Sequence, residues 1–283
     1  MHRWGRPAGR PHPLRKRDFL TVSETPLLQL RGISKSFGSV QALTDVDFEV
    51  RNGEVMALVG DNGAGKSTLI KCIAGIHPTD HGETVFDGEV VHIHGPKDAA
   101  RLGIEVVYQD LALCDNLDVV QNMFLGRETH DRFYRLKEPS MEQRAAETLE
   151  TLAVTTIRSI RQPVATLSGG QRQSVAVAKA VQWNSRLVIL DEPTAALGVA
   201  QTRQVLDLVQ RLADRGLAVV LISHNLHDIF EVATRITVLR LGRSIAIFDR
   251  ATTSQQDVVQ AITAGIVTSV PGMAGAEGIE GTV

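Results

Sequence analysis

The sequence lacks the features that define several common classes of protein. It holds only two cysteines, Cys72 and Cys114, and their spacing suggests neither a disulfide framework nor a zinc site. No apolar run approaches the roughly 18 to 20 residues that a membrane helix needs, so any role at a membrane would come through a partner. The net charge of −2 argues against a general nucleic-acid-binding surface. We therefore expect a protein of a reducing compartment that does not bind nucleic acid.

The remaining composition is that of a folded α/β protein. The chain has 283 residues, 43% of them hydrophobic, which is enough for one large or two small domains. Residues 1–25 differ, because six basic side chains outnumber two acidic ones, three prolines interrupt any helix, and no apolar segment of a secretory signal follows. We interpret this segment as a disordered leader, or as the product of a start codon upstream of the native one. An arm that binds a lipid surface is the alternative.

A glycine-rich segment, Gly60–Thr68, fits the pattern G-x-x-x-x-G-K-[ST] at every fixed position. An apolar run, Val55–Val59, precedes it and a helix-like segment, Ser67–Ile73, follows it, which is the context that a P-loop requires. Glycines let backbone N–H groups approach phosphate oxygens, Lys66 supplies a positive charge for the β- and γ-phosphates, and the Ser67 hydroxyl suits Mg²⁺. The predicted phosphate-binding residues are Gly60, Asp61, Asn62, Gly63, Ala64, Gly65, Lys66, Ser67 and Thr68.

Two further patterns predict an antiparallel sheet beside this nucleotide-binding core. Val46, Phe48 and Val50 alternate with charged residues, which is typical of a half-buried strand. Further along the chain, Thr84–Phe86 and Glu89–Val91 flank an Asp-Gly pair, which favours a type I′ hairpin.

The pattern changes from strand-like to helical after Gln109, which predicts an inserted helical subdomain. Ser140 and Gln143 have the spacing of a capping box at the start of a helix. The subdomain ends at a Leu-Ser-Gly-Gly-Gln stretch, Leu167–Gln171, followed by a helical pattern. Because free N–H groups at a helix start attract anions, this stretch predicts a second anion site, remote in sequence from the P-loop.

Acidic residues follow a strand that is expected to be fully buried. Leu187–Leu190 is a continuous apolar run, typical of a central parallel strand, and Asp191 and Glu192 stand at its carboxyl end, where such sheets bind ligands. Asp191 would belong to the Mg²⁺ shell, and Glu192 would deprotonate the attacking water. The alternative is a pair of solvated acids. His224 ends another apolar run, 218–222, beside the same expected edge, although an isolated histidine is more often structural.

These motifs, together with Phe37 upstream of the P-loop, occur in the order and spacing of the ATP-binding cassette (ABC) ATPases. The resemblance covers about residues 27–250. It implies an α/β fold, with a P-loop NTPase (RecA-like) core, an antiparallel β subdomain and an inserted α-helical subdomain. We expect one domain over 26–264, divided into a core of about 26–108 and 175–250, a helical subdomain of about 109–174 and a C-terminal helix of about 253–264, with a Gly-rich, disordered tail over 265–283.

The resemblance also implies roles for single residues. Phe37 would stack on adenine, and the Mg²⁺ ligands would be Ser67, Gln109 and Asp191. The catalytic residues would be Glu192 as the base, His224 as the γ-phosphate sensor and Gln109, which would also relay the nucleotide state. In a head-to-tail homodimer, the residues that complete the ATP site of the opposite subunit would be Ser168, Gly169, Gly170 and Gln171. Gly198 stands where the family has an aspartate, which puts one contact across the dimer in doubt.

Three segments resemble the ATPases of bacterial importers for ribose, xylose, fructose and related monosaccharides: Ala100–Gln109, Asn122–Glu128 and Thr194–Gly198. The resemblance implies a transmembrane permease partner, a periplasmic or extracellular sugar-binding protein, and a place on the cytoplasmic face of the bacterial inner membrane. The chain holds one of each motif and no internal repeat, like the members that have a single cassette. Which sugar is moved would depend on the permease and the binding protein.

Two other functional classes stay open beside sugar import. The chain could be the ATPase of an exporter or of a lipid- or lipoprotein-handling system, which the sugar-type segments argue against. It could also be a non-transport cassette protein of DNA repair or translation. Repair types insert long coiled coils and translation types carry tandem cassettes, and the sequence has neither.

Overall fold

The computed structural model describes residues 25–267. The predicted leader and Gly-rich tail lie almost wholly outside these residues, and both interpretations stay predictions. Among the described residues, no helix is both long and apolar enough to span a bilayer.

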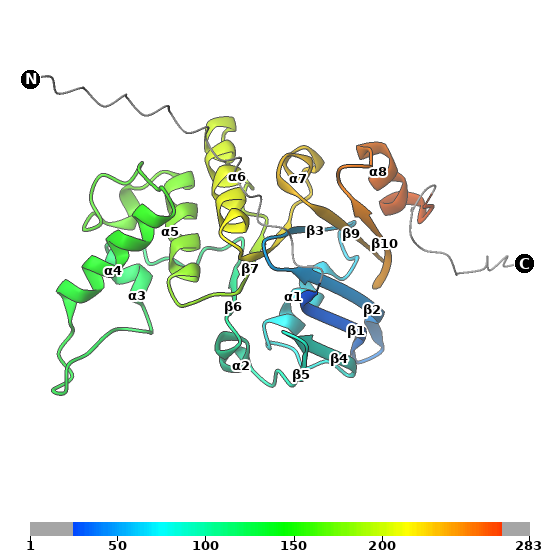
Figure 1. The fold of residues 1–283 in the computed structure, drawn as a ribbon, viewed down its shortest axis with the longest axis horizontal. Coiled ribbons are helices and arrows are strands. Elements are labelled where there is room, and N and C mark those ends of the chain that lie inside the picture. Colours follow the sequence, from blue (N-terminus) through cyan, green and yellow to red (C-terminus); the bar gives the residue numbers. More distant parts are fainter. Residues whose placement is uncertain (1–24, 268–283) are drawn as a thin grey trace, which may run out of the picture.

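A six-stranded sheet forms the centre of the molecule (Figure 1), in the order β10-β9-β3-β8-β7-β6. Every neighbouring pair is parallel except β9 and β10, which are antiparallel. The strands are β3 (Val55–Val59), β6 (Ile104–Val107), β7 (Leu187–Asp191), β8 (Ala218–Ile222), β9 (Arg235–Arg240) and β10 (Arg243–Asp249).

A second, four-stranded sheet is antiparallel throughout, in the order β2-β1-β4-β5. Its strands are β1 (Pro26–Phe37), β2 (Val40–Arg51), β4 (His81–Phe86) and β5 (Glu89–Val91). The predicted inward side chains of β2, Val46, Phe48 and Val50, are buried. Asp87 and Gly88 both have positive φ, 54° and 82°, as a type I′ turn requires. The predicted antiparallel sheet and its hairpin are therefore confirmed.

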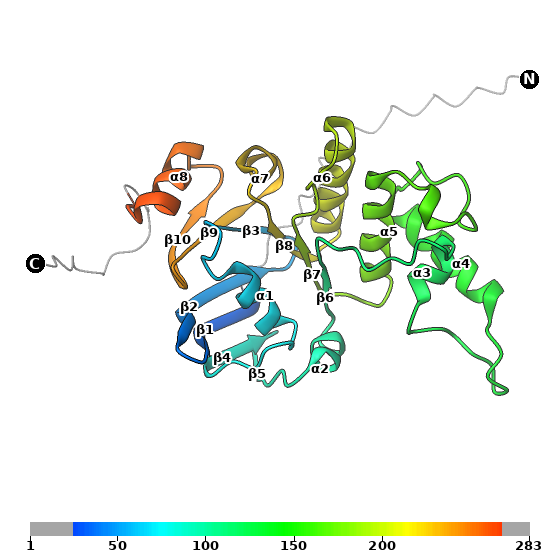
Figure 2. The same cartoon turned by 180° about the vertical axis from the view of Figure 1, so that it is seen from behind.

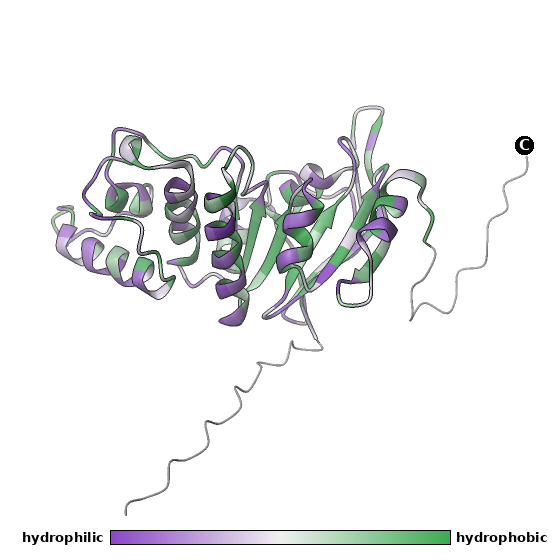
Figure 3. Ribbon diagram, turned by 90° about the horizontal axis from the view of Figure 1, so that it is seen from above, coloured by the Kyte–Doolittle hydropathy of each residue, from purple (hydrophilic) through white to green (hydrophobic). Residues whose placement is uncertain are grey.

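Helices cover both faces of the central sheet. Their bounds are α1 (Lys66–Ile73), α2 (Pro96–Arg101), α3 (Val119–Phe124), α4 (Glu138–Thr151), α5 (Gly169–Val181), α6 (Val199–Asp214), α7 (Leu226–Val232) and α8 (Gln255–Ala264), with a 3₁₀ turn, η1, at Val164–Thr166. Helices α6, α7 and α8 lie on one face, and α1 lies on the other, toward the antiparallel sheet (Figure 2). Seen from above, the strands are hydrophobic and the helices turn polar sides outward (Figure 3).

The side chains of β3 point alternately to two faces of the sheet, and its apolar run is continuous because both faces are buried. Met56 and Leu58 pack with α1 and the antiparallel sheet, whereas Ala57 and Val59 pack toward α7 and α8. A strand that is buried on both faces has no position for a polar side chain. The predicted P-loop NTPase fold is thus confirmed.

A helical lobe, made of α3, α4, η1 and α5, lies at one end of the molecule (Figures 1 and 2). Its buried side chains continue into the core that α6 forms against the central sheet. The exact division points between subdomains stay a prediction.

The capping box expected at Ser140 and Gln143 is wrong, because α4 starts earlier, at Glu138, and Ser140 lies in its first turn. Pro139 is favoured in a first helical turn, where a backbone N–H has no partner, and it moves the start upstream.

A buried ion-pair cluster joins the two sheets. Glu54, just before β3, is fully buried, and its carboxylate accepts a hydrogen bond of 3.1 Å from Nη2 of Arg235 on β9. Nη1 of the same arginine lies 2.8 Å from Oε1 of Glu49 on β2. Each charge is therefore paired at the seam between the sheets.

Removing one member of this cluster should destabilise the fold. We expect Glu54→Ala to lower the free energy of unfolding by about 3–5 kcal/mol, because it leaves the Arg235 guanidinium, which is only 14% exposed, incompletely paired. Urea unfolding followed by circular dichroism measures this loss. Asp98→Ala is the control, since its ion pair with Arg101 is on the surface and should contribute below about 1 kcal/mol. Equal losses in the two variants would contradict the assignment.

Candidate nucleotide-binding site

The turn between β3 and α1 needs glycine at two positions for different close contacts. Gly60 has φ 150°, and a Cβ added there would lie 2.1 Å from the carbonyl oxygen of Leu239. Gly65 has φ 104°, and a Cβ there would lie 2.8 Å from the Leu43 side chain. Any side chain would therefore displace the loop from β9 or β2. The glycine pattern of the sequence is explained by packing against both sheets as well as by backbone conformation.

Lys66 points back into this loop. Its Nζ donates hydrogen bonds to the carbonyl oxygens of Gly60, at 2.6 Å, and Asp61, at 3.0 Å. Burial lowers the pKa of Lys66, and the negative charges of Glu192, Asp61 and Asp191 oppose that shift. These carboxylates favour the charged form, so the loop holds a cation at its centre.

The loop opens on a cavity of about 730 Å³, within the range of small-molecule sites. The P-loop forms one side, and the carboxyl ends of β7 and β8 form the other. The predicted site residues that line it are Asn62, Gly63, Ala64, Gly65, Lys66, Ser67, Thr68, Gln109, Asp191, Glu192 and His224. Residues from four separate parts of the sequence therefore meet at one place.

The cavity contains a donor set that fits Mg²⁺. Ser67, Gln109 and Asp191 bring a hydroxyl, an amide and a carboxylate oxygen to the same cavity, and a hard cation prefers oxygen ligands. Burial raises the pKa of Asp191, opposed by the charges of Lys66 and Lys71. No cluster of three or more His, Cys, Asp or Glu side chains that could hold a metal ion occurs within residues 25–267. This set fits an ion shared with ligand phosphates, as is usual for Mg²⁺.

Glu192 and His224 form a hydrogen-bonded pair at the edge of the cavity. His224 Nδ1 lies 2.7 Å from Oε2 of Glu192, whose side chain is 17% exposed. Glu192 has φ 51°, and its amide donates to the carbonyl of Ile222 at the end of β8. A strained backbone at such a position is typical of functional sites. The geometry aims this carboxylate into the cavity beside Lys66.

Asp228 is a site-supporting residue that the sequence analysis missed. It is buried in α7 and accepts hydrogen bonds from Thr194 Oγ1 at 2.7 Å and Asn225 Nδ2 at 2.9 Å. It thereby ties the loop after Glu192 to the loop after His224. The only sequence signal was Asn225, a typical N-cap residue, three positions ahead of a first-turn acid.

Phe37 does not line the cavity. The residue is 44% exposed, and its ring packs edge-on against His77, with centroids 5.0 Å apart. The wall at this side is formed instead by Val40, Gln41, Ala42, Leu241 and Gly242, none of which the sequence analysis selected. Adenine stacking on Phe37 stays a prediction.

The signature stretch, Ser168–Gln171, lies at the start of α5 and is not part of this cavity. Ser168 and Gln171 form a capping box, in which the side-chain oxygen Oε1 of Gln171 accepts a hydrogen bond from the Ser168 backbone N–H at 2.8 Å. A Cβ on Gly169 would lie 2.8 Å from the end of the Leu197 side chain, so a larger residue there would have to displace that side chain. Gly198 is the N-cap of α6, where no side chain caps the helix.

The fold and the site together define a P-loop nucleoside triphosphatase. The model of one family, described as ABC transporter, matches residues 43–195, which is more than half of the chain. The chain belongs to the ABC transporter family, and it is an ATP-binding cassette of that family, as the sequence analysis expected.

Individual relatives agree. The chain is 45% identical over 248 residues to the fructose import ATP-binding protein FrcA of Rhizobium meliloti, covering 86% of this chain and 95% of that one. It is 46% identical over 237 residues to the xylose/arabinose import ATP-binding protein XylG of Sulfolobus acidocaldarius, covering 84% and 94%. The ribose import ATP-binding protein RbsA of Yersinia pestis is 39% identical over 243 residues, which make up 84% of this chain and 46% of that longer protein.

Solved structures support the fold. A nucleotide-free ATP-binding cassette from an ABC transporter superposes with a TM-score of 0.73 at 24% identity, covering 85% of this chain and 96% of that one. A dimeric bacterial ABC transporter cassette gives a TM-score of 0.67 at 23% identity, covering 79% and 98%.

The position of Lys66 predicts that replacing this residue weakens ATP binding. We expect Lys66→Ala to weaken ATP binding by about 10-fold or more, because a charge-assisted hydrogen bond contributes about 1.5–3 kcal/mol. Isothermal titration calorimetry measures the affinity. Lys97→Ala, on the exposed side of α2, is the control and should bind like the wild type. Unchanged ATP affinity in the Lys66 variant would refute its role in phosphate binding.

Proposed function

We propose that the chain is the ATP-hydrolysing subunit of a bacterial sugar importer and that it energises import through a membrane permease. The observation that carries the catalytic part is the convergence of Lys66, Asp191, Glu192 and His224 on one cavity. The import proteins to which the chain is 39–46% identical over most of its length support the sugar substrate. Exporters, lipid-handling systems and non-transport cassettes are less favoured, because the relatives compared are named for sugar import.

The proposed hydrolysis follows from the wall of the cavity. P-loop amides and Lys66 bind the phosphates, which orients the γ-phosphate toward Glu192. Ser67, Gln109 and Asp191 would hold Mg²⁺, which neutralises phosphate charge when bound. The Glu192 carboxylate accepts a proton from a water molecule. The oxygen of that water attacks the γ-phosphorus, and ADP leaves. The His224 contact holds Glu192 in place and brings the imidazole to where it can sense the γ-phosphate.

The signature stretch is proposed to act across a homodimer. Ser168 and Gly169 are exposed at a helix start, where N–H groups attract an anion, yet they are absent from their own subunit's cavity. A head-to-tail pair would bring them to the partner's ATP. ATP would then close the pair, and hydrolysis would reopen it to move the permease.

Gln109 is proposed to relay the nucleotide state to the permease. Its neighbours Tyr108 and Asp110 line a second cleft, of about 330 Å³, that also includes Lys179 and Trp183 of the α5 region. Gln109 thus separates the nucleotide cavity from a surface opening. We place the subunit on the cytoplasmic face of the membrane, with a sugar-binding protein on the other side.

Glu192 tests the hydrolytic mechanism. Glu192→Gln should retain ATP binding, while turnover falls by about 10²–10⁴-fold, the usual contribution of a general base. A phosphate-release assay at saturating ATP measures turnover. Glu231→Gln, an exposed acid of α7, is the matched control. Near wild-type turnover in Glu192→Gln would remove this residue from the role of base.

Ser168 tests the composite site. The Glu192→Gln protein should become a dimer with ATP, because a nucleotide bound by both faces stabilises only the pair. Adding Ser168→Arg should abolish the dimer without changing ATP binding by the monomer, since the change is remote from the P-loop. Light scattering with and without ATP measures the mass. Ser140→Arg, on the exposed side of α4, is the control, and a Ser168→Arg protein that still dimerised would overturn the proposed trans role.

A further inference from the structure

We propose that Arg161 is a positioning residue for the signature stretch, Ser168–Gln171. Arg161 holds the loop before this stretch against α3 and α4, and so sets the direction in which the stretch faces a nucleotide bound by the partner subunit. The inference rests on the proposed composite site, since it assigns Arg161 an effect on that site alone.

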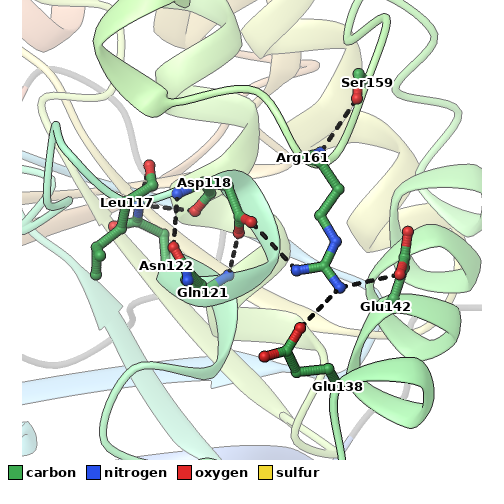
Figure 4. Close-up of polar contacts among 8 residues, drawn as sticks. All are labelled: Leu117, Asp118, Gln121, Asn122, Glu138, Glu142, Ser159 and Arg161. Carbon is green, nitrogen blue, oxygen red and sulfur yellow. Dashed lines mark hydrogen bonds and ion pairs between the residues drawn. The ribbon is translucent and has the colours of Figure 1, made fainter.

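Arg161 is the centre of an ion-pair cluster that joins three segments of the helical lobe. One of its guanidinium nitrogens lies 3.3 Å from Asp118, and the other lies 3.0 Å from Glu142 and 3.4 Å from Glu138. Figure 4 shows the three carboxylates around the guanidinium, one from the start of α3 and two from α4. Without Arg161, three negative charges would face one another and repel.

The loop that carries Arg161 depends on its neighbours for its shape. Between α4 and η1, this part of the described chain forms no helix or strand. This loop and the start of η1 lie along residues 115–120, and Arg161 is near one end of that contact. The main-chain hydrogen bonds between them are Val120 N to Ile160 O at 3.3 Å, Val164 N to Leu117 O at 3.0 Å and Ala165 N to Asp115 O at 3.0 Å.

The same two segments reach the signature stretch from both sides. Gln171 Nε2 donates to the carbonyl oxygen of Thr156, in the Arg161 loop, at 2.6 Å. Arg172, the next residue of α5, pairs with Asp115 at 3.1 Å. A shift of the Arg161 loop relative to residues 115–120 would therefore move Thr156 relative to Asp115, and so change the orientation of the helix start that contacts both.

Residues 114–118 are themselves held from within. The side chain of Asn122 is fully buried, and its amide nitrogen donates to the carbonyl oxygens of Cys114, Leu117 and Asp118 at 2.9–3.2 Å. Its amide oxygen accepts from the Cys114 N–H at 2.7 Å. Figure 4 shows Asn122 beneath this segment. The Arg161 loop is therefore the part that moves when the cluster is broken.

The exposure of the cluster separates positioning from stability. The side chains of Arg161, Glu138 and Glu142 are 35%, 55% and 44% exposed, and the ion pairs among these three contribute little to global stability, whereas the Asp118 side chain is 14% exposed. Losing Arg161 should displace the loop without unfolding the lobe. A displacement of the order of 1 Å at a catalytic contact can cost about 10²-fold in rate.

Arg161→Ala tests the inference. ATP affinity of the monomer should stay within about twofold of the wild type, while ATPase turnover at saturating ATP falls by about 10-fold or more. ATP-driven dimerisation in the Glu192→Gln background should weaken by a similar factor. Arg161→Lys should restore most of both. The matched control is Arg135→Ala, which removes an exposed ion pair with Asp131 in the same lobe and should change neither.

A triple variant distinguishes repulsion among the carboxylates around Arg161 from misfolding of the helical lobe. Adding Glu138→Gln and Glu142→Gln to Arg161→Ala removes two of the facing charges and should recover part of the turnover. Wild-type turnover and dimerisation in Arg161→Ala would overturn the inference, as would a loss of monomer ATP binding or no recovery in the triple variant. If the Glu192→Gln protein does not dimerise with ATP, the proposed composite site is wrong as well. If the Glu192→Gln protein dimerises with ATP and the addition of Arg161→Ala leaves dimerisation unchanged, only the role of Arg161 is wrong.

Discussion

The structure depends on one constraint, which is that phosphate oxygens must be met by backbone N–H groups at the turn between β3 and α1. Such a turn leaves no room for side chains, and it packs so closely on β9 and β2 that Gly60 and Gly65 are both needed. The buried parallel strand before the turn and the helix after it hold the loop rigid. Lys66 then fills the centre of the loop with a positive charge.

The central sheet supplies the rest of the chemistry from its carboxyl edge. Because β7 and β8 are buried on both faces, their first polar residues appear only where the strands end. Asp191, Glu192 and His224 are therefore collected beside the P-loop. Burial raises the pKa of Asp191 and lowers the pKa of Lys66, and the charge of each group limits the pKa shift of the other.

The helical lobe holds the start of α5, which does not line its own subunit's nucleotide cavity and which we propose binds the nucleotide of a partner subunit. Besides its buried apolar side chains, the lobe has two polar anchors: the buried Asn122 fixes residues 114–118, and Arg161 fixes its own loop by charge.

Local patterns in the sequence were sufficient for the P-loop, the buried strands, the type I′ hairpin and the start of α5, because each depends on backbone conformation or burial over a few residues. The order of these motifs was sufficient for the family. Tertiary structure alone decided the rest. Arg161 meets Asp118 across 43 residues of sequence, and Asp228 reaches Thr194 across 34. It also decided that Phe37 packs on His77, outside the cavity wall, and that α4 starts before Ser140. Long-range side-chain contacts of this kind depend on how whole elements pack, and no short stretch of sequence carries that information.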